Sequence, residues 1–120
     1  MAQEKNFENK IKAYLKNRNA YFIKYWAGAK FTKSGVPDIL VCDKGSFIAI
    51  EVKAQSGKPS LLQLVNLEKI REAGGYGLLL YPQDFMGFTT FMENRHPKHD
   101  FYHYNIEKQN QWMKKLKEEK

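Results

Sequence analysis

The apolar residues of this chain recur with the spacing of two helices in its first two thirds. Residues 3–17 carry one apolar stripe at a spacing of 3.6 residues, which predicts a helix. The stripe contains Phe7, Ile11, Tyr14 and Leu15. A second helix is predicted from Ser60, because Ser60 and Gln63 have the spacing of a capping box and an apolar run follows them. The Gly74-Gly75 pair is expected to end this helix.

Four short runs rich in β-branched, aliphatic and aromatic residues predict strands; they are 20–26, 38–43, 46–54 and 76–81. Lys44-Gly45 separates the second run from the third, and two residues are the length of a tight hairpin loop. These two strands should therefore be antiparallel. The last strand follows the second helix and can return through a right-handed crossover. The pattern predicts an α/β fold with a mixed central sheet flanked by helices.

The last third of the chain is less regular. Residues 84–104 are rich in aromatic side chains, and we expect a turn of helix and an edge strand there. Residues 105–118 carry apolar and basic positions at helical spacing, which predicts a basic amphipathic helix. Because no repeat or linker divides the sequence, we expect residues 1–120 to form one domain, with a core at about 4–81 and an extension at 84–120.

The composition is that of a folded chain. Hydrophobic residues make up 42% and aromatic residues 14% of the 120 positions, which excludes a disordered chain. No apolar run is long enough to span a membrane, and the first ten residues lack the apolar segment of a signal peptide. We therefore expect a cytoplasmic protein, in the host cytoplasm if a phage encodes it. The one cysteine, Cys42, excludes an internal disulfide and is predicted to be a small buried side chain.

The charge distribution favours a polyanionic partner. Twenty Lys and Arg stand against thirteen Asp and Glu, a net charge of +7, and residues 1–60 hold eleven basic and five acidic residues. A basic field on so small a protein is typical of nucleic-acid binding. Acidic residues kept in the basic half need a reason; they are Glu4, Glu8, Asp38, Asp43 and Glu51.

The predicted hairpin brings two of these acids together. A loop of two residues at 44–45 places Asp38 directly opposite Glu51, on one face of the sheet, with Cβ atoms roughly 5 Å apart. Lys53 points to the same face because it follows Glu51 by two residues. Opposed carboxylates repel each other unless a cation lies between them, and Mg²⁺ prefers carboxylate oxygen and keeps several waters. One such water can act as a nucleophile that Lys53 orients.

These residues form a recognisable motif. Twelve residues separate Gly35-Val36-Pro37-Asp38 from Glu51-Val52-Lys53, and a glutamine, Gln63, lies on the next helix. Over about residues 4–81 the chain resembles the PD-(D/E)xK nuclease superfamily, and it is most similar to small stand-alone phage-type members of the VRR-NUC family. It departs from that family after the strand 76–81, where no Val-Arg-Arg tripeptide follows.

The resemblance implies a restriction-endonuclease-like α-β-β-β-α-β core and a site that uses Mg²⁺ or Mn²⁺. It implies a catalytic set of five residues: Glu8, Asp38, Glu51, Lys53 and Gln63. Among them Asp38, Glu51 and Glu8 would bind the metal, and we expect the backbone carbonyl of Val52 as a further metal ligand.

Some of these residues also have plainer interpretations. Gln63 can serve only as the capping partner of Ser60, and Glu8 can be a surface acid, with Glu4 as the second candidate on that helix. Three lysines lie in or near the Gly-containing segment that leads to Asp38, and we expect them to contact DNA phosphates; they are Lys24, Lys30 and Lys33.

Three functions remain open. The leading one, implied by the resemblance, is a structure-specific DNA endonuclease that acts as a homodimer on branched DNA such as Holliday junctions and leaves a 5′-phosphate and a 3′-hydroxyl. The second is a restriction-like or flap nuclease with the same site. The third is a non-catalytic DNA-binding module, which the intact set of Glu8, Asp38, Glu51 and Lys53 argues against.

Overall fold

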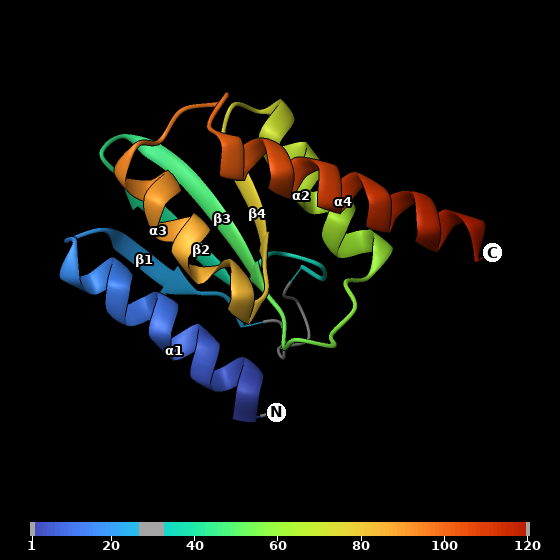
Figure 1. Ribbon diagram of the computed structural model, residues 1–120, viewed down its shortest axis with the longest axis horizontal. Coiled ribbons are helices and arrows are strands. Elements are labelled where there is room, and N and C mark those ends of the chain that lie inside the picture. The colour runs from blue at the N-terminus through green and yellow to red at the C-terminus, as the bar shows by residue number, and fades with distance from the viewer. Residues whose placement is uncertain (1, 27–32, 120) are drawn as a thin grey trace.

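The computed structural model of the protein describes residues 2–26 and 33–119 (Figure 1). The elements follow one another as α1 (Ala2–Asn17), β1 (Tyr21–Lys24), β2 (Ile39–Asp43), β3 (Ser46–Val52), α2 (Leu61–Glu72), β4 (Tyr76–Leu80), the 3₁₀ turn η1 (Pro82–Asp84), α3 (Phe85–Glu93) and α4 (Asp100–Glu118). Within these ranges no helix has both the length and the apolar content needed to cross a membrane.

The four strands form one mixed sheet in the order β1-β2-β3-β4. The first three strands are antiparallel, while β3 and β4 are parallel and joined through α2, so the predicted sheet is confirmed. Lys44 and Gly45 both have positive φ angles, 48° and 83°, which is the backbone that a tight hairpin turn of primed type requires. The turn pairs Asp43 with Ser46, and this sets the register of the whole hairpin as predicted.

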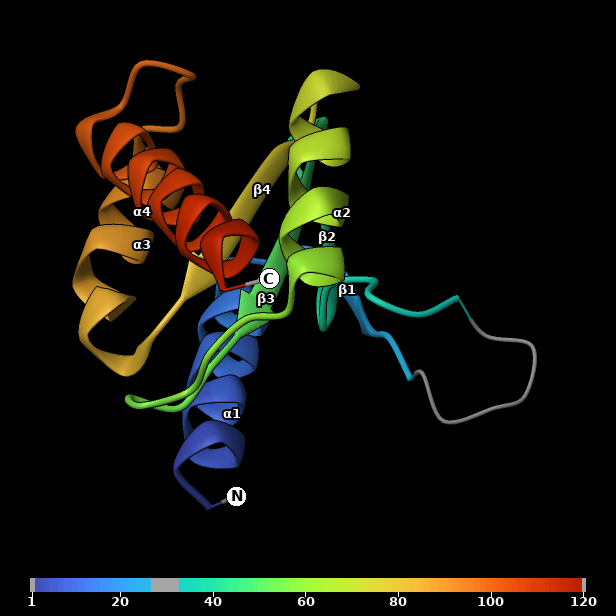
Figure 2. The same ribbon diagram turned by 90° about the vertical axis from the view of Figure 1, so that its right-hand side faces the viewer.

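Helices cover both faces of the sheet (Figure 2). One face packs against α1 and α3 in a cluster that includes Ile11, Leu15, Ile48, Ile50, Phe88 and Phe91. The other face packs against α2 through a smaller cluster of Leu64, Leu67, Leu79 and Tyr81. The alternation of side chains along β3 explains the division, because Ile48, Ile50 and Val52 enter the larger cluster while Glu51 points to the face that α2 covers.

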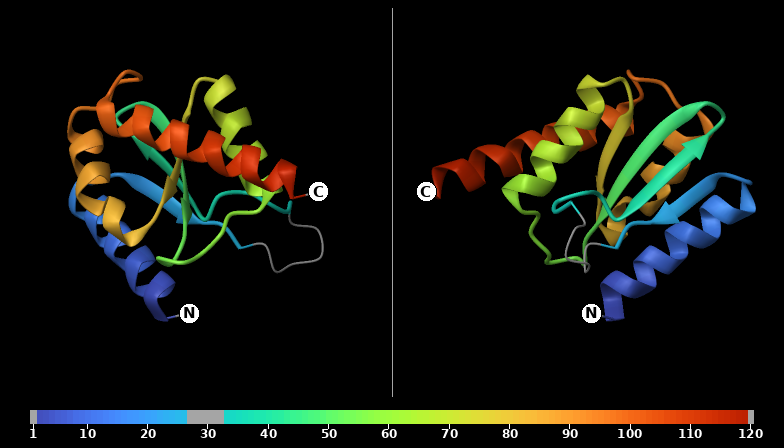
Figure 3. Two further views of the ribbon diagram at one scale, coloured as in Figure 1. Left: turned by 45° about the vertical axis from the view of Figure 1, so that its right-hand side comes forward. Right: turned by 180° about the vertical axis from the view of Figure 1, so that it is seen from behind.

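The long helix α4 closes the β4 edge of the sheet (Figures 1 and 3). Asn105 accepts a hydrogen bond from the Leu79 amide at 2.9 Å and donates one to the Leu79 carbonyl at 2.8 Å. Gln109 donates to the Gly77 carbonyl at 2.9 Å. These two amides take the place of a further strand, so the backbone groups of an edge that could pair with another chain are already satisfied.

The prediction for residues 84–104 is wrong in one respect: they form α3 and the start of α4, and no edge strand is present in this described part of the chain. The aromatic residues follow helical spacing, and their rings pack between helices and sheet. Phe91 stacks on Tyr102 with ring centroids 5.3 Å apart, and Tyr76 of β4 contacts both rings. Aromatic residues have a high propensity for strands, but in this segment the packing of their side chains favours helices.

Cys42 also departs from its prediction, because it is exposed. Side chains alternate along β2, and Val41 and Asp43 take the buried positions.

Candidate active site

Asp38 and Glu51 lie opposite each other at one end of the β2–β3 hairpin, as the sequence predicts. The observed pair of Ile39 with Ile50 makes Asp38 and Glu51 the next pair along. Asp38 Oδ2 accepts a hydrogen bond from the Val52 amide at 2.8 Å, so the backbone of β3 fixes the orientation of this carboxylate.

Gly35 lets the segment before Asp38 lie against α2. Its φ angle is +77°, and a Cβ atom there would come within 2.6 Å of Leu62 and 2.8 Å of Asn66. Only glycine combines this backbone conformation with so close an approach. The Gly35–Asp38 motif is thus explained locally: glycine allows the close contact with α2, and Asp38 follows at the end of the segment.

Glu51 is a buried carboxyl with an unusual environment. Only 2% of the residue is exposed, and its Oε1 atom has no hydrogen-bond partner among the residues that the structure describes. Its Oε2 atom lies 3.5 Å from Lys53 Nζ. Burial, followed by repulsion from Asp38, raises the pKa of Glu51 to about 8, although Lys53 acts in the opposite direction. When both opposed acids are charged they repel each other, and a further cation is needed to offset that repulsion.

Glu8 reaches the same region from α1 through a lysine. It is buried, and Lys24 Nζ lies 2.7 Å from Glu8 Oε1 and 3.6 Å from Asp38 Oδ1. Lys12 adds a second ion pair to Glu8 at 2.8 Å. Burial raises the pKa of Glu8, but the hydrogen bonds from Lys12 and Lys24 outweigh it and hold that pKa below its ordinary value. Glu8 is therefore not a surface acid, and Lys24 connects it to Asp38.

The donor set fits a hard divalent cation. Asp38 and Glu51 offer carboxylate oxygens, one of them buried without a partner, and Mg²⁺ is commonly held by one or two carboxylates and several waters. In the described ranges, no three acidic, histidine or cysteine side chains are close enough to form a ready-made metal site. The Lys24 ammonium contacts both Glu8 and Asp38, so Glu8 is joined to the opposed acids through this lysine.

The other predicted site residues lie as follows. Gln63 forms the full capping box with Ser60. Its side-chain Oε1 accepts a hydrogen bond from the Ser60 backbone amide at 2.9 Å, and the Gln63 backbone amide donates one to Ser60 Oγ at 3.1 Å. Lys33 is exposed, and its carbonyl accepts a hydrogen bond from the Tyr25 hydroxyl at 2.9 Å. Lys30 lies outside the described residues. Lys24, expected on the DNA path, is instead largely enclosed between acids.

Residues that the sequence reasoning missed hold the segment after Lys53. The Tyr81 hydroxyl donates to the Gly57 carbonyl at 2.8 Å, and Asp84 accepts from the Tyr81 amide at 2.8 Å. From α1, the side chain of Gln3 accepts from the Gln55 amide at 2.7 Å. No local pattern signals these contacts, because each joins segments that are far apart in the sequence or depends on the path of the chain beyond β4.

Asp43, a fifth acid of the basic half, has a structural role. It is buried, and Arg18 binds its carboxylate through two hydrogen bonds, at 3.0 and 2.9 Å. Arg95, from the segment between α3 and α4, adds a hydrogen bond to the carboxylate at 2.9 Å and one to the Asp43 carbonyl at 2.7 Å. Burial raises the pKa of Asp43, but the two guanidinium groups outweigh it and keep that pKa below its ordinary value.

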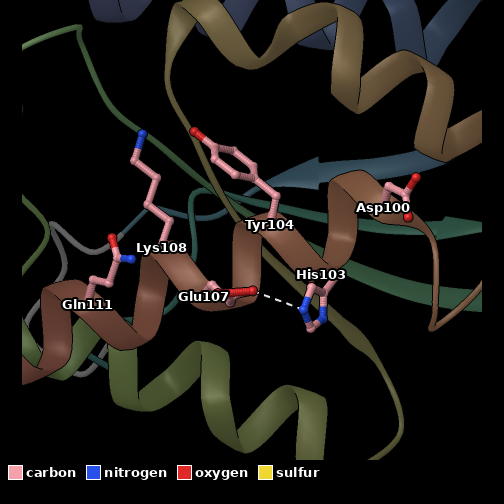
Figure 4. A pocket seen from close by; sticks show the side chains of 6 residues that line it. All are labelled: Asp100, His103, Tyr104, Glu107, Lys108 and Gln111. Atoms are coloured by element: carbon pink, nitrogen blue, oxygen red, sulfur yellow. Dashed lines mark ion pairs between the residues drawn. The ribbon is translucent and has the colours of Figure 1, made fainter.

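A groove of about 480 Å³ on the surface of α4 contains none of the predicted site residues (Figure 4). Its lining residues are Asp100, His103, Tyr104, Glu107, Lys108 and Gln111. The one ion pair drawn there joins His103 Nε2 to Glu107 Oε1 at 2.9 Å, and both side chains are mostly exposed. An exposed pair one helical turn apart is typical of a solvated helix face, so the candidate chemistry stays at the end of the hairpin.

Comparison with known proteins finds similar proteins both by sequence family and by structure. A family model described as archaeal Holliday junction resolvase (Hjc) matches residues 2–117. The solved structure of Hjc, a Holliday junction resolvase from the archaeal hyperthermophile Archaeoglobus fulgidus, matches with a TM-score of 0.50 and 23% identity over 64% of this chain and 66% of that chain. At that identity the likeness shows the fold. No match was found among curated proteins.

These findings fit the predicted PD-(D/E)xK superfamily, while the VRR-NUC, phage-type placement within it stays a prediction. Because the family model spans nearly the whole sequence, the chain belongs to the archaeal Holliday junction resolvase family, a family of metal-dependent, structure-specific DNA endonucleases.

Proposed function

We propose that this chain cuts DNA at four-way junctions by metal-dependent hydrolysis of phosphodiester bonds, with Asp38, Glu51 and Lys53 as its catalytic centre. One observation carries the proposal. The buried Glu51 lies opposite Asp38, has an unpartnered oxygen and contacts the Lys53 ammonium at 3.5 Å. A fold needs no such arrangement for stability, since opposed acids cost free energy, whereas a hydrolytic metal site needs it.

In this proposal each residue has a separate task. Asp38 and Glu51 hold the metal, and Asp38 keeps its orientation through the Val52 amide. The bound ion supplies an acidified water and offsets charge on the phosphate. Lys53 donates a hydrogen bond to the attacking water or to a phosphate oxygen, and Glu51 keeps the ammonium in place. The products expected are a 5′-phosphate and a 3′-hydroxyl.

We also propose Mg²⁺ or Mn²⁺ as the metal, because the available side-chain donors are carboxylate oxygens and hard cations prefer them. Glu8 and the Val52 carbonyl are retained as candidate further ligands. Gln63 is retained as a candidate site residue whose capping contacts compete with that role.

A homodimer is the proposed assembly, because a four-way junction requires two symmetric incisions. We define the exposed sheet face as Tyr21, Ile23, Leu40, Cys42 and Phe47, which lie in register across β1, β2 and β3. Tyr21, Ile23 and Phe47 are 74%, 47% and 45% exposed. Large apolar side chains gathered in this way commonly mark an interface, so this face is the candidate dimer surface.

The dimer has its own test. Tyr21→Asp combined with Phe47→Asp should give a monomer in sedimentation experiments, while Met86→Asp, a change at a 79% exposed position on α3, should leave the dimer intact. A wild-type protein that sediments only as a monomer, and still prefers junctions, would refute the dimer.

Three narrower points stay predictions. The placement among stand-alone VRR-NUC proteins rests on the Gly35–Asp38 and Glu51–Lys53 motifs alone.

We propose that residues 1–120 act as a single nuclease domain, because side chains of α3 and α4 belong to the same hydrophobic cluster as those of α1 and the sheet. A cytoplasmic location, or the host cytoplasm for a phage-encoded protein, is the setting expected for a DNA substrate.

The function is tested with an end-labelled four-way junction incubated with and without Mg²⁺. We expect paired cuts near the branch point that need the metal, and little cleavage of linear duplex of the same sequence. Preferred cleavage of flaps or linear duplex would favour the restriction-like or flap nuclease. Junction binding with no cleavage in Mg²⁺ or Mn²⁺ would favour the non-catalytic module.

A further inference from the structure

The Lys24 ammonium lies between two acids of the active site. Its Nζ atom is 2.7 Å from Glu8 Oε1 and 3.6 Å from Asp38 Oδ1, and the side chain is only 19% exposed. Among the described residues, Lys24 is the lysine that contacts two of the three acids, since Lys12 contacts only Glu8 and Lys53 only Glu51. It is therefore the cation shared between α1 and the hairpin.

The two oxygens of Asp38 are not equivalent. Oδ2 accepts a hydrogen bond from the Val52 amide at 2.8 Å, so Oδ1 has the greater capacity left for a cation. Lys24 already faces Oδ1. A divalent ion bound through Asp38 would bring two positive charges beside this ammonium, in a place where water screens them poorly.

We propose that Lys24 is the counter-cation of the metal-free site and that the divalent ion displaces its ammonium from Asp38. This inference rests on the proposed metal-dependent function. Lysine suits such an exchange, because its charge is a compact ammonium on a flexible four-carbon stem. The ammonium can give up Asp38 at 3.6 Å while keeping Glu8 at 2.7 Å, or it can release both and contact a DNA phosphate. Lys24 thereby offsets part of the repulsion between the acids in the metal-free protein.

The exchange is tested by titrating Mg²⁺ or Mn²⁺ into metal-free, DNA-free protein and measuring the heat of binding. Lys24→Met keeps the length of the side chain and removes the charge, so it should bind the metal about tenfold more tightly, because no cation has to be displaced. The same variant should melt at a lower temperature without metal and gain more from the metal than wild type does. Lys24→Arg keeps the charge and should show no gain in affinity.

Lys12→Met is the matched control, because Lys12 pairs with Glu8 at 2.8 Å and does not contact Asp38. It should lower the melting temperature of the metal-free protein while leaving metal affinity close to that of wild type. If both lysine-to-methionine variants tighten metal binding equally, the effect is a general one of net charge, and the proposed exchange at Asp38 is wrong.

A measurement on the wild-type protein keeps the test valid if Lys24→Met does not fold. With ¹⁵N at the lysine Nζ atoms, Mg²⁺ should shift the Lys24 ammonium signal, assigned with Lys24→Arg, more than that of Lys12. Metal binding with an unchanged Lys24 signal, or with unchanged affinity in Lys24→Met, would overturn the exchange alone. Failure of wild type to bind either metal would instead overturn the proposed metal-dependent function.

Discussion

At the scale of single residues, the environment of each acid decides what it can do. Asp43 and Glu51 are both buried, yet Asp43 is held by two arginines while Glu51 faces another acid and keeps an unpartnered oxygen. Their pKa values move in opposite directions for that reason, down for Asp43 and up to about 8 for Glu51. The first arrangement stabilises the fold, and the second is suited to binding a cation.

Asp38→Asn should separate stability from metal binding. Removing one of the two opposed charges relieves their repulsion, so the metal-free variant should melt at or above the wild-type temperature. Mg²⁺ or Mn²⁺ should raise the melting temperature of wild type by mass action and that of the variant far less. Thermal melts with and without metal check this, and a wild-type melt that does not respond to either metal would contradict the paired-acid site.

Asp43→Asn should destabilise the protein in a pH-dependent way. Leaving the half-buried Arg18 and Arg95 without their buried carboxylate should cost about 3 kcal/mol, at the lower end of the range for breaking a buried ion pair. Because the folded pKa of Asp43 lies below the ordinary value of 3.8, its contribution is fully present above that pH and is lost as the pH falls below it. Urea unfolding of both proteins should give a stability difference that is constant from pH 7 to about 5 and shrinks below about 4. A constant difference down to pH 3 would contradict this role.

At the scale of elements, the hairpin and the segment before Asp38 place the carboxylates. Gly35 and Gly45 both have positive φ angles, +77° and +83°, but only Gly35 would bring a Cβ atom into contact with α2. Asp38 lies three residues after Gly35, so a shift of the backbone at Gly35 would also move the Asp38 carboxylate.

Gly35→Ala and Gly45→Ala form a matched pair. Both introduce backbone strain of about 1 kcal/mol or more, and Gly35→Ala adds a clash with Leu62. We expect Gly35→Ala to be the more destabilising of the two and to reduce cleavage, while Gly45→Ala keeps the cleavage rate. Urea denaturation and junction cleavage of both variants check this. Equal losses of stability and rate in the two variants would mean that contact with α2 does not position Asp38.

Gln63→Ala distinguishes two roles on α2. Loss of the capping box should cost about 0.5–1 kcal/mol and leave the cleavage rate within a few fold. The side-chain oxygen of Gln63 is already used to accept the Ser60 amide, which is why we expect the smaller effect. A cleavage rate that falls a hundredfold, with a loss of stability smaller than that expected for the cap, would place Gln63 in the active site instead.

The sequence predicted the elements wherever short-range rules applied. The register of Asp38 with Glu51 followed from the length of one turn, and the α2 start followed from one capping motif. The position of Lys24 between Glu8 and Asp38 could not be predicted, because it depends on how α1 packs on the sheet. The same is true of α4, where Asn105 and Gln109 look like ordinary helix-surface residues until β4 lies beside them.

At the scale of the whole molecule, the β4 edge of the sheet and the exposed sheet face differ in how they are covered. The β4 edge is closed by amide side chains of α4, whereas the exposed sheet face across β1 to β3 carries large apolar side chains. Strand pairing with another chain along the β4 edge is therefore disfavoured, whereas a second copy can associate through the exposed sheet face. A dimer formed there would keep one active site in each copy, as paired incision of a four-way junction requires.

The central claim, that Asp38, Glu51 and Lys53 form a hydrolytic metal site, is tested most directly by single-turnover cleavage of a labelled four-way junction with Mg²⁺. Wild type, Glu51→Gln and Lys53→Met should bind the junction with similar affinity, because affinity depends on many phosphate contacts. Both variants should lose at least about a hundredfold in rate. Variants that bind and cut the junction at the wild-type rate would show that the chemistry lies elsewhere.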